Sequence, residues 1–391
     1  MTKPVIESLL DTDLYKLTML QAMVARVPNF DAVYRFRCRN TPEFPLAEIA
    51  AEVKHEIEAL CSLRFTGDEL AYLAGLRYMA PGFVDYLEVY QLRERHIEVT
   101  TRGDELVIEA RGPIQYSMMF EIYVLSIVNE LYFRRLAGPV ADLAIGRAAL
   151  VRKIVEAAEA PQLRTPFEVS DFGTRRRFSR EWQVEVVSTL KAQGGAWFKG
   201  TSNVDLARRL DLVPIGTMAH EYLQIHQAFG GPIRDFQKRA LENWVQAYRG
   251  DLGIALTDVI SMDAFLADFD LYFAKLFDGL RHDSGDPVQW GEKALAHYAR
   301  LRLPVTGKRI VFSDGLSMPG AISIYRHFGD RIQTGFGIGT NLTNDVGHKA
   351  LNIVMKVVEA NGQPVAKLSD ATGKTMCDDD AYVAFLRSSF K

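Results

Sequence analysis

The first third of the chain carries hydrophobic patterns of two kinds, one typical of helices and one typical of strands. Residues 13–27 repeat apolar positions at the helical period after a polar Asp-Thr-Asp start, and residues 116–133 form a long apolar stretch that predicts a buried helix. Residues 32–39 alternate apolar and basic positions, as a half-exposed strand does, and residues 97–112 contain two short runs around an Arg-Gly-Asp turn. The pattern predicts a mixed α+β domain over residues 1–140.

From about residue 165 the pattern changes to short apolar runs, each followed by small or polar residues and then by a helical stretch. Six segments follow this plan: FEVSDFGTR, LVPIGTMAH, GIALTD, FDGLRHDSGDP, RIVFSDGLS and IQTGFGIGT. Such alternation is typical of parallel βα units, and a complete barrel needs eight of them. We therefore expect an α/β fold with an irregular or incomplete α/β barrel over residues 141–345. Residues 352–370 predict a hairpin with an Asn-Gly turn, so we expect residues 346–391 to join the N-terminal domain.

Composition narrows the class of protein. The 391 residues are 48% hydrophobic and carry a net charge of −3, which supplies a large core and gives no general attraction for nucleic acid or membranes. The start of the chain lacks the apolar segment of a signal peptide, and no run reaches the ~18 apolar residues of a membrane span. The three cysteines lie far apart without a CxxC pair, which disfavours a disulfide framework or a zinc cluster. We expect a cytoplasmic protein.

Polar side chains follow the ends of the six apolar runs. In parallel α/β folds the carboxyl ends of the strands form one edge, where ligands bind whatever the chemistry. We therefore expect these residues to converge: Asp171, Arg175, Arg176, Arg177, His220, Asp258, Arg281, His282, Asp283, Ser284, Asp286, Ser313, Asp314, Gly337, Gly339 and Thr340.

Several of these residues have both a functional and a structural interpretation. Three arginines, Arg175 to Arg177, stand just before a predicted helix, where their positive charges would oppose the positive end of the helix dipole. Either a bound anion compensates these charges or the side chains are solvated at the start of the helix. They form one short cluster rather than the long basic stripe of a nucleic-acid binder. Arg281 and Asp283 suit a sugar phosphate and its hydroxyls, or a salt bridge with each other. The loop GFGIGTNL offers backbone amides to a phosphate, or close strand–helix packing.

His220, in the segment GTMAHEYL, stands where a strand gives way to a helix. It could be structural, a metal ligand, a base or a nucleophile. No HxH or HExxH pattern accompanies it, so we discount metal ligation by histidine. Asp258, at the end of the next strand, could accept a hydrogen bond from one imidazole nitrogen, which would fix the tautomer and leave the other nitrogen as base or nucleophile.

Taken together in this order, the motifs resemble the nicotinate phosphoribosyltransferases. The resemblance runs from LLDTDLYKLTM through YRFRCR, SDFGTRRRFS, KGTSNV, GTMAHE, GLRHDSGDP and FSDGLS to the glycine loop and AKLSD, and so covers nearly the whole chain. It implies a mixed N-terminal domain, an irregular barrel and a homodimer with shared active sites. It also implies transfer of a phosphoribosyl group from 5-phosphoribosyl-1-pyrophosphate to nicotinate, coupled to ATP hydrolysis, with Mg2+ on the departing pyrophosphate.

The resemblance also assigns roles. His220 is the residue that ATP phosphorylates, and Asp258 orients it. Phe172 and Tyr15 of the partner subunit enclose the pyridine ring, and Arg175 faces the substituent of that ring. The residues expected to bind the other parts of the substrates are Thr201, Ser202, Arg281, Asp283, Ser313, Asp314, Gly315, Gly337, Gly339 and Thr340.

Ser202 helps to choose among related substrates. Nicotinamide-using relatives carry an aspartate at this position, and an aspartate would repel the nicotinate carboxylate, whereas a hydroxyl can donate to it. We therefore expect nicotinate to be the substrate. The alternatives are a nicotinamide enzyme and a non-catalytic barrel that binds a phosphorylated ligand. A quinolinate enzyme ranks third among the related enzymes, because such enzymes are shorter and lack the histidine phosphorylation.

Overall fold

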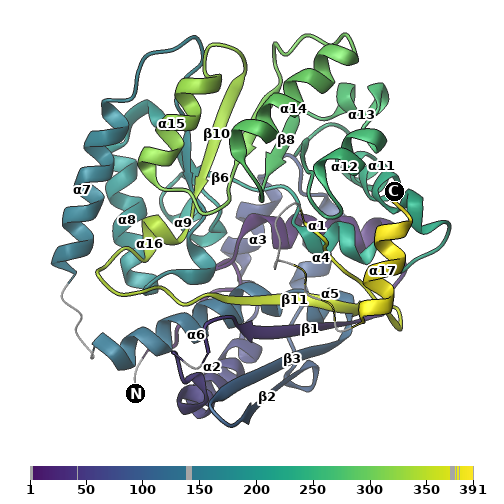
Figure 1. Ribbon diagram of the computed structural model, residues 1–391. Helices are drawn as coiled ribbons and strands as arrows, with labels where there is room; N and C mark the ends of the chain where they lie inside the picture. Colours follow the sequence, from purple (N-terminus) through teal and green to yellow (C-terminus); the bar gives the residue numbers. More distant parts are fainter. Residues whose placement is uncertain are drawn as a thin grey trace.

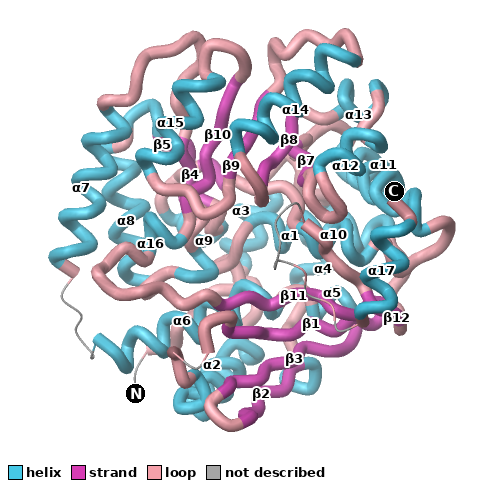
Figure 2. Tube along the Cα trace, viewed as in Figure 1, coloured by secondary structure: helices cyan, strands magenta, loops and turns pink. Residues whose placement is uncertain are grey.

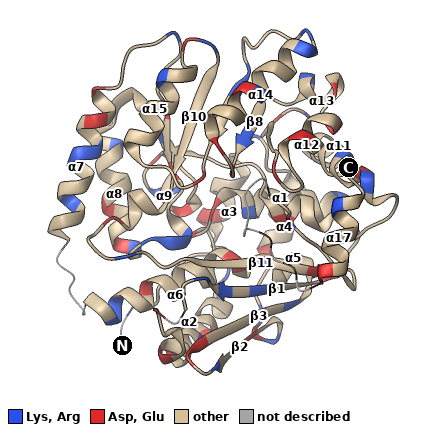
Figure 3. Cartoon of the chain, in the orientation of Figure 1, with Lys and Arg blue, Asp and Glu red and all other residues tan. Residues whose placement is uncertain are grey.

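The structure is a computed structural model that describes residues 3–41, 43–137, 143–369, 375, 377 and 379–390. Two β-sheets organise the described chain, one antiparallel and one parallel, and helices cover both (Figure 1, Figure 2). One hydrophobic core runs continuously from one sheet to the other. None of the described helices is both long and apolar enough to cross a membrane. Acidic and basic residues are interspersed over both parts of the molecule (Figure 3).

The antiparallel sheet takes its strands from both ends of the chain. Its order is β12-β11-β1-β3-β2, so a strand from the last forty residues of the described chain pairs directly with the first strand. The strands are β1 (Asp31–Cys38), β2 (Ile97–Arg102), β3 (Glu105–Pro113), β11 (Ile353–Ala360) and β12 (Gln363–Pro364).

Both hairpins that the sequence predicts are present in this sheet. β2 and β3 pair around Gly103, whose φ of 59° lies in the left-handed region that glycine adopts without strain. β11 and β12 pair around Asn361 and Gly362, with φ of 50° and 74°. Two successive positive φ angles match the right-handed twist of the flanking strands, which is why Asn-Gly predicts this turn well.

The helices of the N-terminal part pack against the antiparallel sheet and connect it to the rest. The predicted helix of residues 13–27 is confirmed as α1, and the long apolar stretch forms α6 after the short α5. α6 is buried on nearly all sides along its first three turns, which explains why its sequence shows little amphipathic pattern. The elements are α1 (Leu14–Arg26), η1 (Leu46–Ile49), α2 (Ala50–Ser62), α3 (Gly67–Ala74), α4 (Pro81–Glu88), η2 (Glu94–His96), α5 (Ile114–Ser117) and α6 (Phe120–Ala137).

The second sheet is wholly parallel and confirms the prediction of an incomplete α/β barrel. Its order is β6-β5-β4-β10-β9-β8-β7, which curls round without pairing the two end strands among the described residues. The sequence predicted six of these strands and missed the seventh, β5, because FKGT is short and has only one large apolar residue. The strands are β4 (Val169–Asp171), β5 (Phe198–Thr201), β6 (Val213–Pro214), β7 (Ile254–Leu256), β8 (Gly279–His282), β9 (Arg309–Phe312) and β10 (Gln333–Ile338).

Helices and short helical turns follow these strands, and many begin at a residue whose side chain caps the first turn. Ser179, Asn203 and Asp286 accept hydrogen bonds from the backbone N–H three residues on, which fixes where each helix starts. The elements are α7 (Ala144–Ala158), η3 (Thr174–Arg176), α8 (Arg180–Gln193), η4 (Gly195–Trp197), α9 (Val204–Arg209), α10 (His220–Ile225), η5 (Ile233–Asp235), α11 (Phe236–Tyr248), α12 (Met262–Asp268), α13 (Leu271–Leu276), α14 (Pro287–Arg300), α15 (Met318–Phe328), α16 (Thr340–Thr343) and α17 (Asp380–Ser388).

The segment before α1 attaches the N-terminal part to the parallel sheet. Asp13 and Asn203 form an antiparallel β-bridge, and the Leu14 N–H donates to the Ser202 carbonyl at 2.7 Å. The first turn of α1 therefore lies beside the end of β5. This contact places side chains from the start of the chain at the carboxyl edge of the barrel.

Candidate active site

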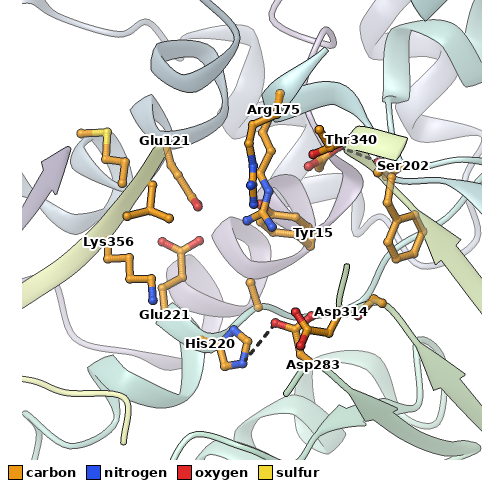
Figure 4. Close-up of a pocket in the computed structure, with 18 of the residues that line it drawn as sticks. Tyr15, Glu121, Arg175, Ser202, His220, Glu221, Asp283, Asp314, Thr340 and Lys356 are labelled. Carbon is orange, nitrogen blue, oxygen red and sulfur yellow. Dashed lines mark hydrogen bonds and ion pairs between the residues drawn. The ribbon is translucent and has the colours of Figure 1, made fainter. Parts of the chain in front are cut away.

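A cavity of about 410 Å³ lies at the carboxyl ends of the parallel strands, and β11 of the other sheet forms its opposite wall. Most residues that the sequence singled out line this cavity, and many of them point into it (Figure 4). Those that line it are Tyr15, Phe172, Arg175, Arg176, Ser202, His220, Arg281, Asp283, Ser313, Asp314, Gly315, Gly339 and Thr340.

Three of the predicted site residues lie behind the wall instead. Thr201 is buried and donates to the Asp171 carboxylate at 2.7 Å, so it supports the end of the strand rather than facing the cavity. Asp258 is buried directly behind His220. Gly337 packs against the ring of Phe172, where any side chain would collide with that ring. Each of the three contacts or adjoins a residue that does line the cavity.

His220 opens helix α10 and reaches across to Asp258. Its Nε2 atom lies 2.7 Å from Asp258 Oδ1, while Asp258 Oδ2 accepts a hydrogen bond from the Ser284 hydroxyl at 2.6 Å. Lys367 Nζ lies 2.6 Å from Asp258 Oδ2 and 2.8 Å from His220 Nε2. A carboxylate and an ammonium group therefore meet at one imidazole nitrogen.

The position of the imidazole proton follows from these contacts. Burial opposes ionisation of Asp258, but His220 and Lys367 hold its pKa well below the usual range. The Asp258 carboxylate only accepts hydrogen bonds and the Lys367 ammonium only donates them, so the two contacts favour opposite protonation states of His220 Nε2. We assign the proton to Nε2 because the contact with Asp258 is the shorter one and Lys367 can donate to the other oxygen of that carboxylate. Burial, and then the charge of Lys367, lower the pKa of His220, so the ring is neutral near neutral pH. Nδ1 then presents its lone pair, and no described residue forms a hydrogen bond with it.

The arginines form a cationic wall on another side of the cavity. Arg175 and Arg176 lie on η3, and neither has a carboxylate within 4.0 Å among the described residues. Burial, followed by the charges of Arg175 and Arg39, lowers the pKa of Arg176 to about 9. The cations thus repel one another in a partly buried place, a cost that a bound anion would relieve. In Figure 4, Arg175 points into the middle of the cavity beside Tyr15.

Arg177, the third arginine of the run, has a different environment. Its guanidinium donates to both oxygens of Asp11, at 2.6 Å and 2.8 Å, and the pair is buried. The amide of Asn129 also donates to the Arg177 backbone carbonyl at 2.6 Å. Arg177 therefore holds the N-terminal segment and α6 against the barrel, and only Arg175 and Arg176 face the cavity.

Tyr15 and Phe172 line the cavity together, and one chain supplies both. The resemblance implies that Tyr15 of the partner subunit lies at this site, whereas in this structure Tyr15 of the same chain lines the cavity. Because the bridge between Asp13 and Asn203 clips the start of α1 to the barrel edge, Tyr15 reaches the cavity of its own chain. An aromatic enclosure for a flat ring is thus available without a second copy.

Ser202 lines the cavity as expected, but its hydroxyl already donates a hydrogen bond within the protein. Its hydroxyl donates to Asp13 Oδ1 at 2.7 Å, and Asp13 also lines the cavity. The hydroxyl at position 202 therefore lies beside a carboxylate that another element supplies. This contact follows from the packing of α1 on β5, which the local sequence around Ser202 does not reveal.

The residues expected to bind the ribose phosphate gather at the ends of β8, β9 and β10. Ser313 donates to Asp283 Oδ1 at 2.9 Å, and Arg281 lies 4.0 Å from the same carboxylate while donating to the Met218 carbonyl at 3.1 Å. The long distance between Arg281 and Asp283 means that the two side chains do not satisfy each other as a close ion pair. Gly339 leads into the single turn of α16, next to these residues.

Three further charged residues near the cavity were not foreseen. Lys16 is fully buried and forms ion pairs with Glu121, at 2.6 Å, and with Glu221. Both carboxylates line the cavity, and the charge of Glu121 favours the ionised form of Arg175. Their positions inside predicted helices gave no signal, because helical glutamates and lysines are usually solvated.

Known proteins are similar to this chain in sequence and in fold. The N-terminal domain of the nicotinate phosphoribosyltransferase (NAPRTase) family matches residues 10–129, and the family itself matches residues 167–391. Nicotinate phosphoribosyltransferases of Herminiimonas arsenicoxydans and Chromobacterium violaceum are 58% and 56% identical over 99% of this chain and 98% of each relative. The crystal structure of nicotinate phosphoribosyltransferase from Vibrio cholerae, 35% identical, gives a TM-score of 0.93 over 100% of this chain and 94% of that one.

Proposed function

The chain belongs to the nicotinate phosphoribosyltransferase family, and we propose that it makes nicotinate mononucleotide and pyrophosphate from nicotinate and 5-phosphoribosyl-1-pyrophosphate. We further propose that the reaction is coupled to ATP through a phosphorylated His220 and serves NAD salvage. The observation that carries the proposal is the cavity in which a neutral histidine faces two half-buried arginines without carboxylate partners.

The surroundings of His220 support a role as phosphoryl acceptor. With Nε2–H held by Asp258, the Nδ1 lone pair is the nucleophile, and it attacks the terminal phosphorus of ATP. The new bond joins Nδ1 to phosphorus, and the bond from phosphorus to the bridging oxygen breaks to release ADP. The positive charge that develops on the imidazole is stabilised by Asp258, which remains ionised. Water later removes the phosphoryl group, which completes one ATP hydrolysis per cycle.

The other walls of the cavity suit nicotinate and 5-phosphoribosyl-1-pyrophosphate. The pyridine ring lies between Tyr15 and Phe172, and Arg175 supplies the positive charge that its carboxylate needs. Arg281, Asp283 and the β9 and β10 ends take the ribose hydroxyls and 5-phosphate. The ring nitrogen then attacks C1 of the ribose as pyrophosphate leaves.

Mg2+ enters the proposal through the substrate rather than through a protein site. No group of three histidine, cysteine, aspartate or glutamate side chains among the described residues is placed to hold a metal ion. Mg2+ commonly binds through substrate phosphates together with one or two carboxylates. Its chemistry in this site would be to neutralise the departing pyrophosphate.

Mass spectrometry tests the central step. After incubation with ATP and Mg2+, we expect an acid-labile phosphate on the peptide that contains His220, and none in His220→Ala. The variant should lose the stimulation by ATP while retaining slow phosphoribosyl transfer, since the other groups still position the substrates. Full ATP stimulation in His220→Ala would contradict the phosphohistidine.

One observation keeps nicotinamide as a second candidate substrate. The Asp13 carboxylate lines the cavity in contact with Ser202, the position at which nicotinamide-using relatives are expected to carry an aspartate. Turnover of nicotinate and nicotinamide under identical conditions separates the two, and we expect nicotinate to be used far better because of Arg175.

A further inference from the structure

Asp13 is a carboxyl group in an unusual place. It precedes α1, is buried, and lines the cavity beside Arg175. The Ser202 hydroxyl donates to it at 2.7 Å, and the Thr174 side chain also forms a hydrogen bond with it. No cation lies within 4.0 Å of it among the described residues, in contrast to Asp11 two residues earlier, which Arg177 holds with two hydrogen bonds.

The groups that face Asp13 come from every element around it. The Thr174 side chain and Arg175 on η3 favour its ionised form, as does Ser202 after β5, whereas Asp171 at the end of β4 disfavours it. Tyr15, the other polar neighbour, is itself held un-ionised by burial. Burial outweighs all of these and raises the pKa of Asp13 to about 6. The carboxyl can therefore change its protonation state at small cost.

A nicotinate anion bound at Arg175 changes this balance. Its carboxylate would lie in the same end of the cavity as Asp13 and would withdraw the Arg175 charge from it. Two carboxylates that share a buried site cannot both stay ionised without a large penalty, and one of them takes a proton. A protonated Asp13 becomes a hydrogen-bond donor, which an ionised carboxylate is not.

We propose that Asp13 is a specificity-determining residue that takes up one proton when nicotinate binds and donates it as a hydrogen bond to the substrate carboxylate. The inference rests on nicotinate being the substrate, as proposed above. The binding step is then nicotinate plus one proton from solvent, and the proton resides on Asp13 in the complex. The ionised form of Asp13 would instead accept a hydrogen bond from the amide of nicotinamide. The two ligands should therefore respond to pH in opposite directions.

Calorimetry of the whole protein tests this proposal. Nicotinate and nicotinamide are titrated at several pH values from about 5.5 to about 8.5, each in two buffers of different ionisation enthalpy. We expect nicotinate binding to take up close to one proton per site above pH 6–7, and its affinity to fall by up to about tenfold per pH unit there. Nicotinamide should take up no proton, and its binding should weaken as the pH falls.

Variants assign the proton to its residue. Asp13→Asn keeps a donor and cannot titrate, so nicotinate binding should lose both the proton uptake and the pH dependence. Glu221→Gln is the matched control, because burial also raises the pKa of Glu221 and its carboxylate also lines the cavity; it should keep both. Ser202→Ala removes the donor that favours ionised Asp13, so the fall in affinity should begin at higher pH.

The outcomes are separable. The role of Asp13 is overturned if nicotinate binds without proton uptake. It is also overturned if the proton uptake persists in Asp13→Asn and disappears in Glu221→Gln. In both cases the proposed function stands. If Asp13→Asn fails to fold, an unchanged pH profile in Ser202→Ala overturns the role of Asp13 instead. Absence of both nicotinate binding and nicotinate turnover in the unmodified protein at about pH 6 overturns the proposed function itself.

Discussion

Arg175 and Arg177 are two positions apart and have opposite surroundings. Arg177 is buried against Asp11, which satisfies its charge, whereas Arg175 faces the cavity with no carboxylate within 4.0 Å among the described residues. The reason is the backbone: Arg175 lies within the 3-10 turn of η3, whereas η3 ends at Arg176 and Arg177 follows in an extended conformation. One arginine can therefore bind a ligand because the other holds the turn in place.

Substituting each of the two arginines should separate these roles. Arg175→Ala should raise the Michaelis constant for nicotinate by an amount equivalent to ~2–4 kcal/mol and leave the unfolding temperature nearly unchanged, because it removes a ligand contact. Arg177→Ala removes the two strongest contacts of the buried Asp11 carboxylate, which keeps only Asn203 and the longer contact with Arg180. The variant should destabilise the fold by up to about 3–5 kcal/mol. Steady-state kinetics and thermal unfolding of both variants check this. An unchanged nicotinate Michaelis constant in Arg175→Ala would remove that residue from the site.

Lys367 should act on the pH dependence of the histidine. Its charge lowers the pKa of His220, and Lys367→Met removes that effect, so the histidine pKa rises. A protonated imidazole has no lone pair for phosphorus, so phosphorylation in the variant should fall as the pH drops through the raised pKa and recover above it. The rate of phosphorylation at saturating ATP, measured against pH, shows this. Lys367→Arg keeps the charge and should keep the original profile; superimposable profiles for Lys367→Met and the unmodified protein would refute the role.

At the residue scale the sequence identified chemistry at the strand ends and missed the partners supplied from elsewhere. His220 and Asp258 follow predicted strands, so topology alone brings them to one edge. Lys367 and Asp13 belong to segments remote in sequence that reach the cavity only through tertiary packing, across β11 and α1. No local pattern marks such residues.

At the scale of elements, the pairing of β10 with β4 determines the aromatic wall. Gly337 lies opposite Ser170 in this parallel pair, and the ring of Phe172 packs against the open face of the glycine. A Cβ at position 337 would penetrate that ring, whereas a Cβ at Gly335, two residues earlier on the same strand face, would meet its nearest side chain at 3.6 Å. The two glycines therefore differ in function although they share a strand.

Gly337→Ala should displace Phe172 and loosen the pocket for the pyridine ring. We expect a loss of nicotinate affinity together with a destabilisation of about 1–3 kcal/mol from overpacking. Gly335→Ala is the matched control and should change neither property appreciably. Nicotinate titration and chemical denaturation of both variants provide the comparison. Equal nicotinate affinities in the two variants would show that Phe172 does not shape the ring site.

The elements that the sequence predicted are those with a strong period or a strong turn. α1, α6 and the Asn361-Gly362 hairpin belong to this group. β5 was missed, and the predicted strand in LVPIGTMAH shrinks to Val213–Pro214, because the rest of that segment runs as a loop to His220. Such short parallel strands owe their conformation to the neighbouring strands rather than to their own residues.

At the scale of the whole molecule, segments of one chain that are far apart in sequence line the same cavity. The parallel sheet supplies the floor, β11 the opposite wall and α1 the aromatic side, and the segments come from the beginning, middle and end of the sequence. The resemblance implied a homodimer with shared active sites. Since Tyr15 and His220 of the same chain line one cavity, we expect the catalytic unit to be a single chain, whether or not the chains associate.

Mixing two inactive variants tests this expectation. Tyr15→Ala and His220→Ala each damage a different part of the site. If a site combined Tyr15 of one chain with His220 of another, hybrid dimers formed after mixing and subunit exchange would contain one intact site and recover up to about a quarter of the original activity in the mixture. A site completed within one chain cannot recover in this way, so we expect no ATP-stimulated activity above that of the separate variants. Specific activity of the unmodified protein should likewise stay constant on dilution across about a thousandfold range, with light scattering recording its association state. Recovery of activity on mixing would instead support the shared site, in which Tyr15 of one chain completes the active site of the other.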